Sequence, residues 1–191
     1  SETMKTPDIL QENGYKYLMF GQTIESFHDT IHLNDIQPVL KDGLYWKKGD
    51  VILSMRTLSM IMHFRPSTNK IINIITGPFY KQHDVDIISD KEISIFNNNL
   101  LNTYKGERVI SNNEVVIYNF ETKKFSQKFE NSMKKNKVTT ETEGLNHILK
   151  DGSMTVEESN YGRILFFNSK AQLEWEYVNN AKNGKSYPLF W

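Results

Sequence analysis

The stretch that decides the fold is residues 51–75, which read VILSMRTLSM IMHFRPSTNK IINII. It contains three short apolar runs, 51–55, 59–64 and 71–75, separated by polar residues and turn formers. Short runs rich in β-branched residues and bounded by such turns predict β-strands, because these side chains pack well on a pleated surface. The connections are short enough to join neighbouring antiparallel strands, so the stretch predicts most of one small sheet.

The same layout recurs twice further along the chain, and a segment before each copy supplies a first strand. Units of roughly 45–60 residues with four strands are typical of β-propeller blades. Unrelated strands of a sandwich would not repeat their turn chemistry in order, so we favour an all-β propeller over a sandwich. The expected blades are residues 28–77, 78–131 and 138–180, with a lead-in or partial blade at 1–27 and a tail at 181–191.

Three blades would make half of a six-bladed ring, whereas closed propellers use about four to eight blades. Two explanations stay open at this point. The chain could be a fragment of a longer protein, or two copies could pair as a homodimer that completes the propeller. Residues 15–23 together with the tail at 186–191 could supply part of a fourth blade.

The composition argues against several classes of function. The 23 basic and 23 acidic residues balance, so we expect no nucleic-acid partner and no binding to an anionic membrane surface. The absence of cysteine excludes a disulfide scaffold, thiol catalysis and cysteine-ligated zinc. No apolar run approaches the ~20 residues of a membrane span, and the first residues lack the layout of a signal peptide.

Polar side chains gather where equivalent strands of the three units end, and such ends meet at one mouth of a propeller channel. These positions are occupied by His32, Asn34, Arg56, His83, Asp84, Asn97, Asn98, Glu157 and Glu158. Each residue alone would be an ordinary strand-end residue. Together they predict an anion site, because an arginine fork matches a tetrahedral oxyanion and a neutral imidazole can attack sulfur or phosphorus.

Several motifs, in this order and spacing, resemble the C-terminal half of the bacterial arylsulfotransferase family. They are His32-x-Asn34, Gly49-Asp50-Val-Ile-Leu-Ser-x-Arg56, Gln82-His83-Asp84 and Ile95-Phe96-Asn97-Asn98. The stretch from Lys150-Asp-Gly152 to Trp175-Glu-Tyr-Val-Asn179 is similar to the family's last blade. The resemblance covers about residues 28 to 180, and the order of the motifs carries it rather than any one of them.

The resemblance implies a six-bladed β-propeller that transfers a sulfuryl group from an aryl sulfate to a phenolic acceptor, with no cofactor and no metal. The family's covalent histidine would be His83, with His32 and Arg56 as further catalytic residues. Asn34, Asn97 and Thr142 would bind substrate. The family implies a periplasmic or secreted location. A further family histidine, from an earlier blade, has no counterpart in the segment before His32.

Two other functions are kept as alternatives. The chain could be a non-catalytic propeller segment that binds a ligand or a protein at the channel mouth. A metal site built from His28, His32, His83 and Asp84 ranks last, because their spacing fits no short metal-binding motif. Two other histidines are interpreted apart from the site: His63, inside a strand, as structural, and His147 as either core or channel lining.

Overall fold

The computed structural model describes residues 5–19 and 29–179, and most of the ordered elements in these ranges are β-strands. The expectation of an all-β protein is therefore confirmed. Three four-stranded antiparallel sheets and one two-stranded sheet are found in the described residues.

The first sheet contains the stretch that decided the fold, and its strands follow one another in the order of the chain. They are β1 (Leu33–Pro38), β2 (Val51–Met55), β3 (Met60–Arg65) and β4 (Lys70–Ile75). The third sheet repeats this order with β11 (Leu145–Ile148), β12 (Met154–Glu158), β13 (Arg163–Phe167) and β14 (Leu173–Val178).

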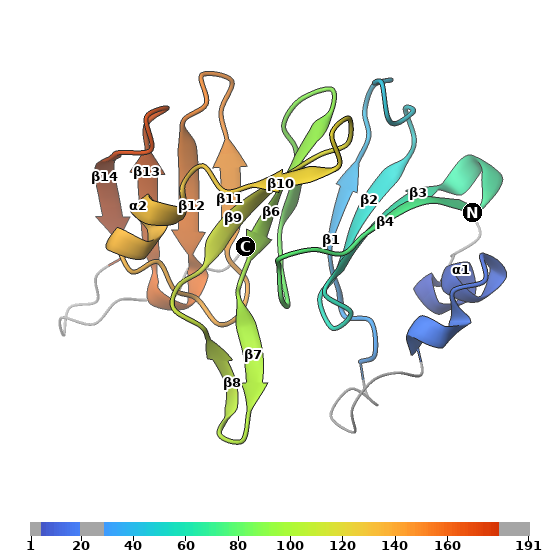
Figure 1. Ribbon diagram of the computed structural model, residues 1–191, viewed down its shortest axis with the longest axis horizontal. Coiled ribbons are helices and arrows are strands. Elements are labelled where there is room, and N and C mark those ends of the chain that lie inside the picture. The colour runs from blue at the N-terminus through green and yellow to red at the C-terminus, as the bar shows by residue number, and fades with distance from the viewer. Residues whose placement is uncertain (1–4, 20–28, 180–191) are drawn as a thin grey trace.

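The second sheet has the same order of strands but carries an insertion. Its strands are β5 (Val85–Ile87), β6 (Glu92–Asn97), β9 (Glu114–Asn119) and β10 (Lys124–Ser126). Between β6 and β9 the chain forms a separate hairpin of β7 (Leu100–Thr103) and β8 (Gly106–Val109), which projects away from the sheets (Figure 1). The sequence repeat did not predict this hairpin, because the other two units have a tight turn at this position.

The described helices are short. They are α1 (Thr6–Glu12) and α2 (Glu130–Lys135), with 3-10 turns η1 (Lys16–Met19), η3 (Pro66–Thr68) and η4 (Ser159–Tyr161). No helix in the described ranges is long and apolar enough to cross a membrane. The expectation of a partial blade at 15–23 is wrong for residues 16–19, which are helical, while residues 20–23 and 186–191 lie outside the described part.

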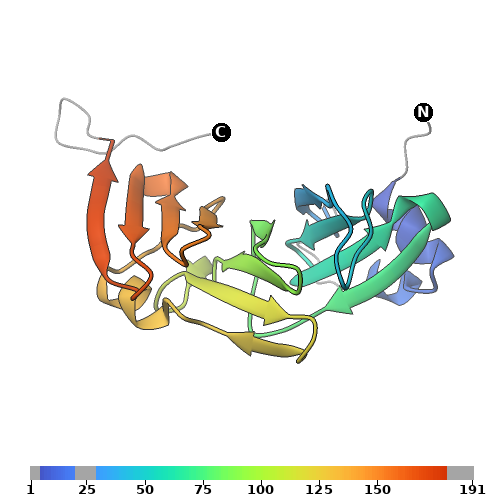
Figure 2. The ribbon, with the colours of Figure 1, turned by 90° about the horizontal axis from the view of Figure 1, so that it is seen from above.

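The three four-stranded sheets follow one another along an open arc (Figure 2). Apolar side chains of neighbouring sheets pack together in shared cores. Ile52 and Ile61 of the first sheet share a core with Ile93 of the second. On the other side, Phe96 of the second sheet packs in one core with Val156 of the third. Each such side chain, once buried, contributes about 1.5–3 kcal/mol, so burial between the sheets stabilises the arc.

Polar contacts at the inner edge of the arc join each sheet to the next. Gln82, which is fully buried, donates from Nε2 to the carbonyl oxygens of Met55 (3.2 Å) and Met60 (3.1 Å) in the first sheet. Two residues later, Asp84 Oδ2 accepts the backbone N–H of Asn146 in the third sheet at 2.8 Å. The segment that carries His83 is therefore held on both sides.

The inner strands β1, β5 and β11 are edge strands of their sheets, so their outward backbone N–H groups need partners from elsewhere. Carboxylates of the preceding sheet supply two of these partners. Asp35 Oδ2 accepts the N–H of Val85 at 2.9 Å, and Asp84 does the same for Asn146. This arrangement repeats between successive sheets and fixes how they are spaced.

His63 has the structural role expected of it. Its Nε2–H donates to Asp50 Oδ2 at 2.8 Å, and both side chains are buried. Arg65 contacts both oxygens of the same carboxylate, at 2.7 and 2.8 Å. Burial alone would raise the pKa of Asp50, but these hydrogen bonds hold it well below its ordinary value.

The Asp84 contact predicts how stability depends on pH. Burial, with Asp86 and Asp35 nearby, raises the pKa of Asp84 to about 8 despite the Asn146 N–H bond. The folded chain then binds a proton that the unfolded chain has lost, so the free energy of unfolding falls between about pH 4 and 8. Asp84→Asn keeps an acceptor for Asn146 and should flatten this fall. The expected gain at pH 8 is on the order of 5 kcal/mol, because the pKa is raised by about four units at about 1.4 kcal/mol per unit.

Urea unfolding of the wild type and Asp84→Asn at several pH values measures the difference. Asp84→Ala is the companion variant, because it also removes the charge but leaves the buried Asn146 N–H without its acceptor. It should be less stable than Asp84→Asn at every pH, by about 1–3 kcal/mol. Parallel pH curves for the wild type and Asp84→Asn would contradict the assigned pKa.

Candidate functional site

The candidate site lies at the end of the arc where the inner strands begin. Three of its residues lie at the starts of the inner strands. His32 directly precedes β1, His83 lies two residues before β5, and Gly144 directly precedes β11. Because the second strand of each sheet is antiparallel to the first, it ends at this same edge. Arg56 after β2 and Asn98 after β6 therefore reach the same rim from neighbouring sheets.

His83 is held by two hydrogen bonds that define its tautomer. Its Nδ1 lies 2.9 Å from Asn98 Oδ1, and its Nε2 lies 3.1 Å from the backbone nitrogen of Glu143. Asn98 donates from Nδ2 to the carbonyl oxygens of Thr140 (3.2 Å) and Glu143 (2.8 Å), which leaves its Oδ1 as the acceptor. His83 therefore carries its proton on Nδ1, and the lone pair is on Nε2.

The surroundings keep His83 neutral. Burial, together with the nearby charges of Arg56 and His32, lowers its pKa to about 4 against the opposing effect of the Asn98 hydrogen bond. At neutral pH the ring is then an uncharged base whose Nε2 lone pair accepts the Glu143 N–H. This is the protonation state that a nucleophilic histidine requires.

His32 is oriented by Asp29. The backbone nitrogen of His32 donates to Asp29 Oδ1 at 2.8 Å, and its Nδ1 lies 2.6 Å from Asp29 Oδ2. A carboxylate only accepts, so Nδ1 carries the proton and Nε2 is left for other contacts. The backbone of His32 has a φ of 47°, a left-handed conformation that is uncommon outside glycine.

A cavity of about 210 Å³ lies beside His83. Its lining comes from all three inner-strand segments: Asn34, Asp35, His83, Asp84, Glu143, Gly144, Leu145 and Ser159. Asn34 Nδ2 donates to the carbonyl oxygen of Gln82 at 2.8 Å, whereas its Oδ1 is buried and has no hydrogen-bond partner among the described residues. This cavity therefore combines a neutral imidazole with a buried hydrogen-bond acceptor.

Arg56 is paired with a residue that the sequence did not point to. Its Nη2 donates to Oε2 of Glu107 on strand β8 at 2.8 Å, and Lys81 donates to Oε1 of the same carboxylate. Neither Lys81 nor Glu107 was among the candidates. Their role depends on the hairpin insertion, which the repeat pattern does not contain.

The structure places the other two candidate substrate-binding residues differently. Asn97 is buried and turned away from His83: its Oδ1 accepts the N–H groups of Tyr80 (2.8 Å) and Asn99 (2.9 Å). The amide that contacts His83 belongs to Asn98. Thr142 lies in the same loop as Glu143, and its hydroxyl accepts from Asn160 Nδ2 at 2.7 Å.

The remaining polar residues of the predicted mouth form separate groups. Glu158 is paired with Arg163, and Glu157 Oε1 accepts from the Ser159 hydroxyl at 2.9 Å. His147 is exposed and lies 3.3 Å from Asp86, so it lines the open surface rather than the core. No three His, Cys, Asp or Glu residues of the described part are grouped as metal ligands, and His28 of the metal hypothesis lies outside that part.

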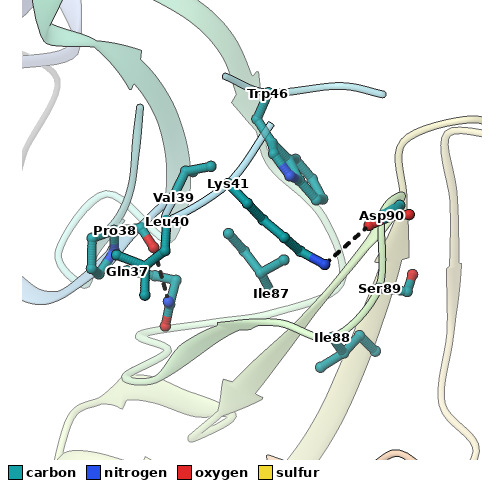
Figure 3. A pocket seen from close by; sticks show the side chains of 10 residues that line it. All are labelled: Gln37, Pro38, Val39, Leu40, Lys41, Trp46, Ile87, Ile88, Ser89 and Asp90. Carbon is teal, nitrogen blue, oxygen red and sulfur yellow. Dashed lines mark hydrogen bonds and ion pairs between the residues drawn. The ribbon is translucent and has the colours of Figure 1, made fainter. Parts of the chain in front are cut away.

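A second cavity, of about 240 Å³, lies between the opposite ends of β1 and β5 (Figure 3). Trp46, Val39 and Ile87 form its apolar part, and Lys41 reaches across it to Asp90 at 3.8 Å. Its lining holds no histidine, and its one cation faces a carboxylate. Of these two cavities, only the one beside His83 has a histidine in its lining.

A protein-family model described as arylsulfotransferase (ASST) matches residues 3–180, which is most of the chain. A search of curated proteins finds no match.

The Asn98 contact predicts the tautomer of His83. In ¹H–¹⁵N spectra of the imidazoles, His83 should show a protonated Nδ1 and an unprotonated Nε2 from neutral pH down to about pH 5. Asn98→Ala removes the acceptor of the Nδ1 proton, so the preference for this tautomer should weaken and rest on the Glu143 N–H alone. Asn113→Ala is the matched control, because Asn113 also donates to the Thr140 carbonyl (3.1 Å) but does not bond His83. Protonated Nε2 in the wild type would contradict the assignment.

Proposed function

Because this chain belongs to the arylsulfotransferase family, we propose that it transfers a sulfuryl group from an aryl sulfate to a phenolic acceptor through a sulfohistidine at His83. The observation that carries the proposal is the neutral His83 ring, whose Nε2 lone pair lies beside a cavity. Covalent transfer divides one difficult displacement into two easier ones and gives ping-pong kinetics.

In the first half-reaction, His83 Nε2 attacks sulfur, the N–S bond forms and the bond between sulfur and the aryl oxygen breaks. The electron pair of that bond leaves with the phenolate. In the second half-reaction, the oxygen of the acceptor phenol attacks sulfur and the N–S bond breaks, which restores neutral His83. We assign the proton exchange with the phenolic oxygens to Nε2 of His32, whose ring Asp29 orients.

The remaining roles follow from position. Arg56 would offset the charge of the sulfuryl oxygens, as positive donors do in other transfers. Asn34 Oδ1, buried without a partner among the described residues, would accept from the hydroxyl of the acceptor phenol. The Glu143 N–H that now points at Nε2 would turn to a sulfuryl oxygen once the donor binds. Thr142, in the same loop, is retained as a substrate contact, whereas Asn97 would act only by supporting the backbone.

We also propose that the three four-stranded sheets are blades of a β-propeller, with boundaries at residues 28–77, 78–131 and 138–180, a lead-in at 1–27 and a tail at 181–191. Their antiparallel order and their placement along an arc support this arrangement. A second copy of the chain would then supply the blades that complete the ring. Trp175 and Tyr177, about half exposed on β14, offer apolar surface for such a contact.

Mass spectrometry tests the covalent step. Incubation with an aryl sulfate should add the mass of one sulfuryl group to a peptide that contains His83. His83→Ala should abolish the adduct and lower the rate of phenol release by roughly 10³-fold or more. His147→Ala, which changes an exposed histidine, is the control and should behave as the wild type. Binding of the aryl sulfate without any adduct or phenol release would instead support a non-catalytic ligand-binding segment.

The pKa of His83 predicts an unusual pH profile for adduct formation. Only the neutral ring attacks, and with a pKa of about 4 the ring is still roughly nine-tenths neutral at pH 5. The rate of adduct formation should therefore hold down to about pH 5, whereas an unperturbed histidine would lose it below about pH 6.5. Rapid-quench measurement of the adduct between pH 4 and 8 distinguishes the two. A fall in rate centred near pH 6.5 would contradict the low pKa.

A further inference from the structure

The hairpin of β7 and β8 brings a carboxylate onto two cations, Arg56 and Lys81. Glu107 stands on β8, and each of its oxygens faces a different cation: Oε2 accepts from Arg56 Nη2 at 2.8 Å and Oε1 from Lys81 Nζ. The side chains of Arg56 and Lys81 are 11% and 17% exposed, whereas that of Glu107 is 38% exposed. The side chains of the two cations are therefore more buried than the carboxylate that they contact.

The two cations come from parts of the chain that the fold holds rigidly. Arg56 directly follows β2, and its backbone nitrogen donates to the His32 carbonyl oxygen at 2.9 Å. Lys81 stands two residues before His83 and has a φ of 51°. Its backbone nitrogen donates to the Ser59 hydroxyl at 3.1 Å. A lysine held in a left-handed conformation costs free energy, and such positions cluster at functional sites.

The charges at this point suit an oxyanion. Two cations face one carboxylate, so the side chains of Arg56, Lys81 and Glu107 together carry one net positive charge. Partial burial alone would raise the pKa of Glu107. The hydrogen bonds from Lys81 and Arg56 outweigh this effect and hold the pKa below its ordinary value, so the carboxylate is ionised. An aryl sulfate ester also carries one negative charge, spread over three oxygens. It can therefore replace the carboxylate with the same charge balance and one more acceptor.

We propose that Lys81 and Arg56 together form the binding site for the sulfate group of the donor, and that Glu107 is an internal carboxylate that occupies this site until a donor displaces it. The identity of the anion as an aryl sulfate rests on the proposed function. Lys81 is then a substrate-binding residue in addition to Arg56. Glu107 determines which anions enter, because a ligand must compete with a carboxylate that is already in place.

The hairpin also determines what else the ligand meets. Tyr104, at the tip between β7 and β8, is almost fully exposed, and Leu101 on β7 is partly exposed. When Glu107 leaves the cations, the hairpin loses its ion pairs with Arg56 and Lys81. Small inorganic anions offer no apolar surface to these side chains. Aryl sulfates should therefore bind more tightly than inorganic sulfate.

The test measures binding of an aryl sulfonate, a probe that keeps the three oxygens and the ring but has no ester oxygen to release. Isothermal titration should show about tenfold tighter binding to Glu107→Gln than to the wild type, and Glu107→Ala should change in the same direction. Lys81→Gln should weaken binding at least tenfold in both the wild-type and the Glu107→Gln background. Glu121→Gln is the matched control: it removes the same charge from an exposed pair with Lys91 and should leave binding unchanged.

The outcomes separate this inference from the proposed function, because the binding measurement needs no transfer. Unchanged or weaker binding by both Glu107 variants would contradict the proposal that Glu107 competes with the donor. Glu107 would then only hold Arg56 in position. Unchanged binding by Lys81→Gln would remove Lys81 from the site. If binding follows the expected pattern but no adduct forms at His83, the anion site stands and sulfuryl transfer fails. If the adduct forms but substitutions of Lys81 and Glu107 leave binding unchanged, sulfuryl transfer stands and the anion site at these residues fails.

Discussion

The whole arrangement depends on how three consecutive residues, Gln82, His83 and Asp84, are held between two sheets. Gln82 is bonded to carbonyl oxygens of the first sheet, and Asp84 accepts a backbone N–H of the third. Both contacts satisfy buried backbone groups that would otherwise cost free energy. His83 stands between them, so its position is set by the packing of the sheets and not by a flexible loop.

The same burial has opposite effects on the two titratable neighbours. It raises the pKa of Asp84 and lowers that of His83, because in each case the charged form loses its hydration. Both groups are therefore uncharged near neutral pH, and the fixed positive charges of the rim belong to Arg56 and Lys81. A neutral imidazole beside fixed cations is the arrangement that the proposed attack on an anionic ester requires, because the cations can hold the ester's oxygens.

The hairpin of β7 and β8 shows how an insertion can change a repeated unit without disturbing its sheet. Strands β6 and β9 pair in regular register although the chain leaves the sheet between them. The insertion leaves the strand pairing intact, because it leaves the sheet at the end of β6 and returns at the adjacent start of β9. It places Glu107 against Arg56, a residue of the neighbouring sheet, and so connects the rims of two repeated units.

The sequence by itself determined the all-β class, the three repeated units and the family, because these depend on strand-forming runs and turn residues that are local in the chain. It also pointed to His32, Arg56 and His83. Only the tertiary structure decided that Asn98 rather than Asn97 contacts His83, because adjacent residues at a strand end point to opposite sides and the exact end of the strand selects one. Likewise, the contact of Glu107 with Arg56 joins residues 51 positions apart. Such a contact arises from packing between sheets, and no local pattern records it.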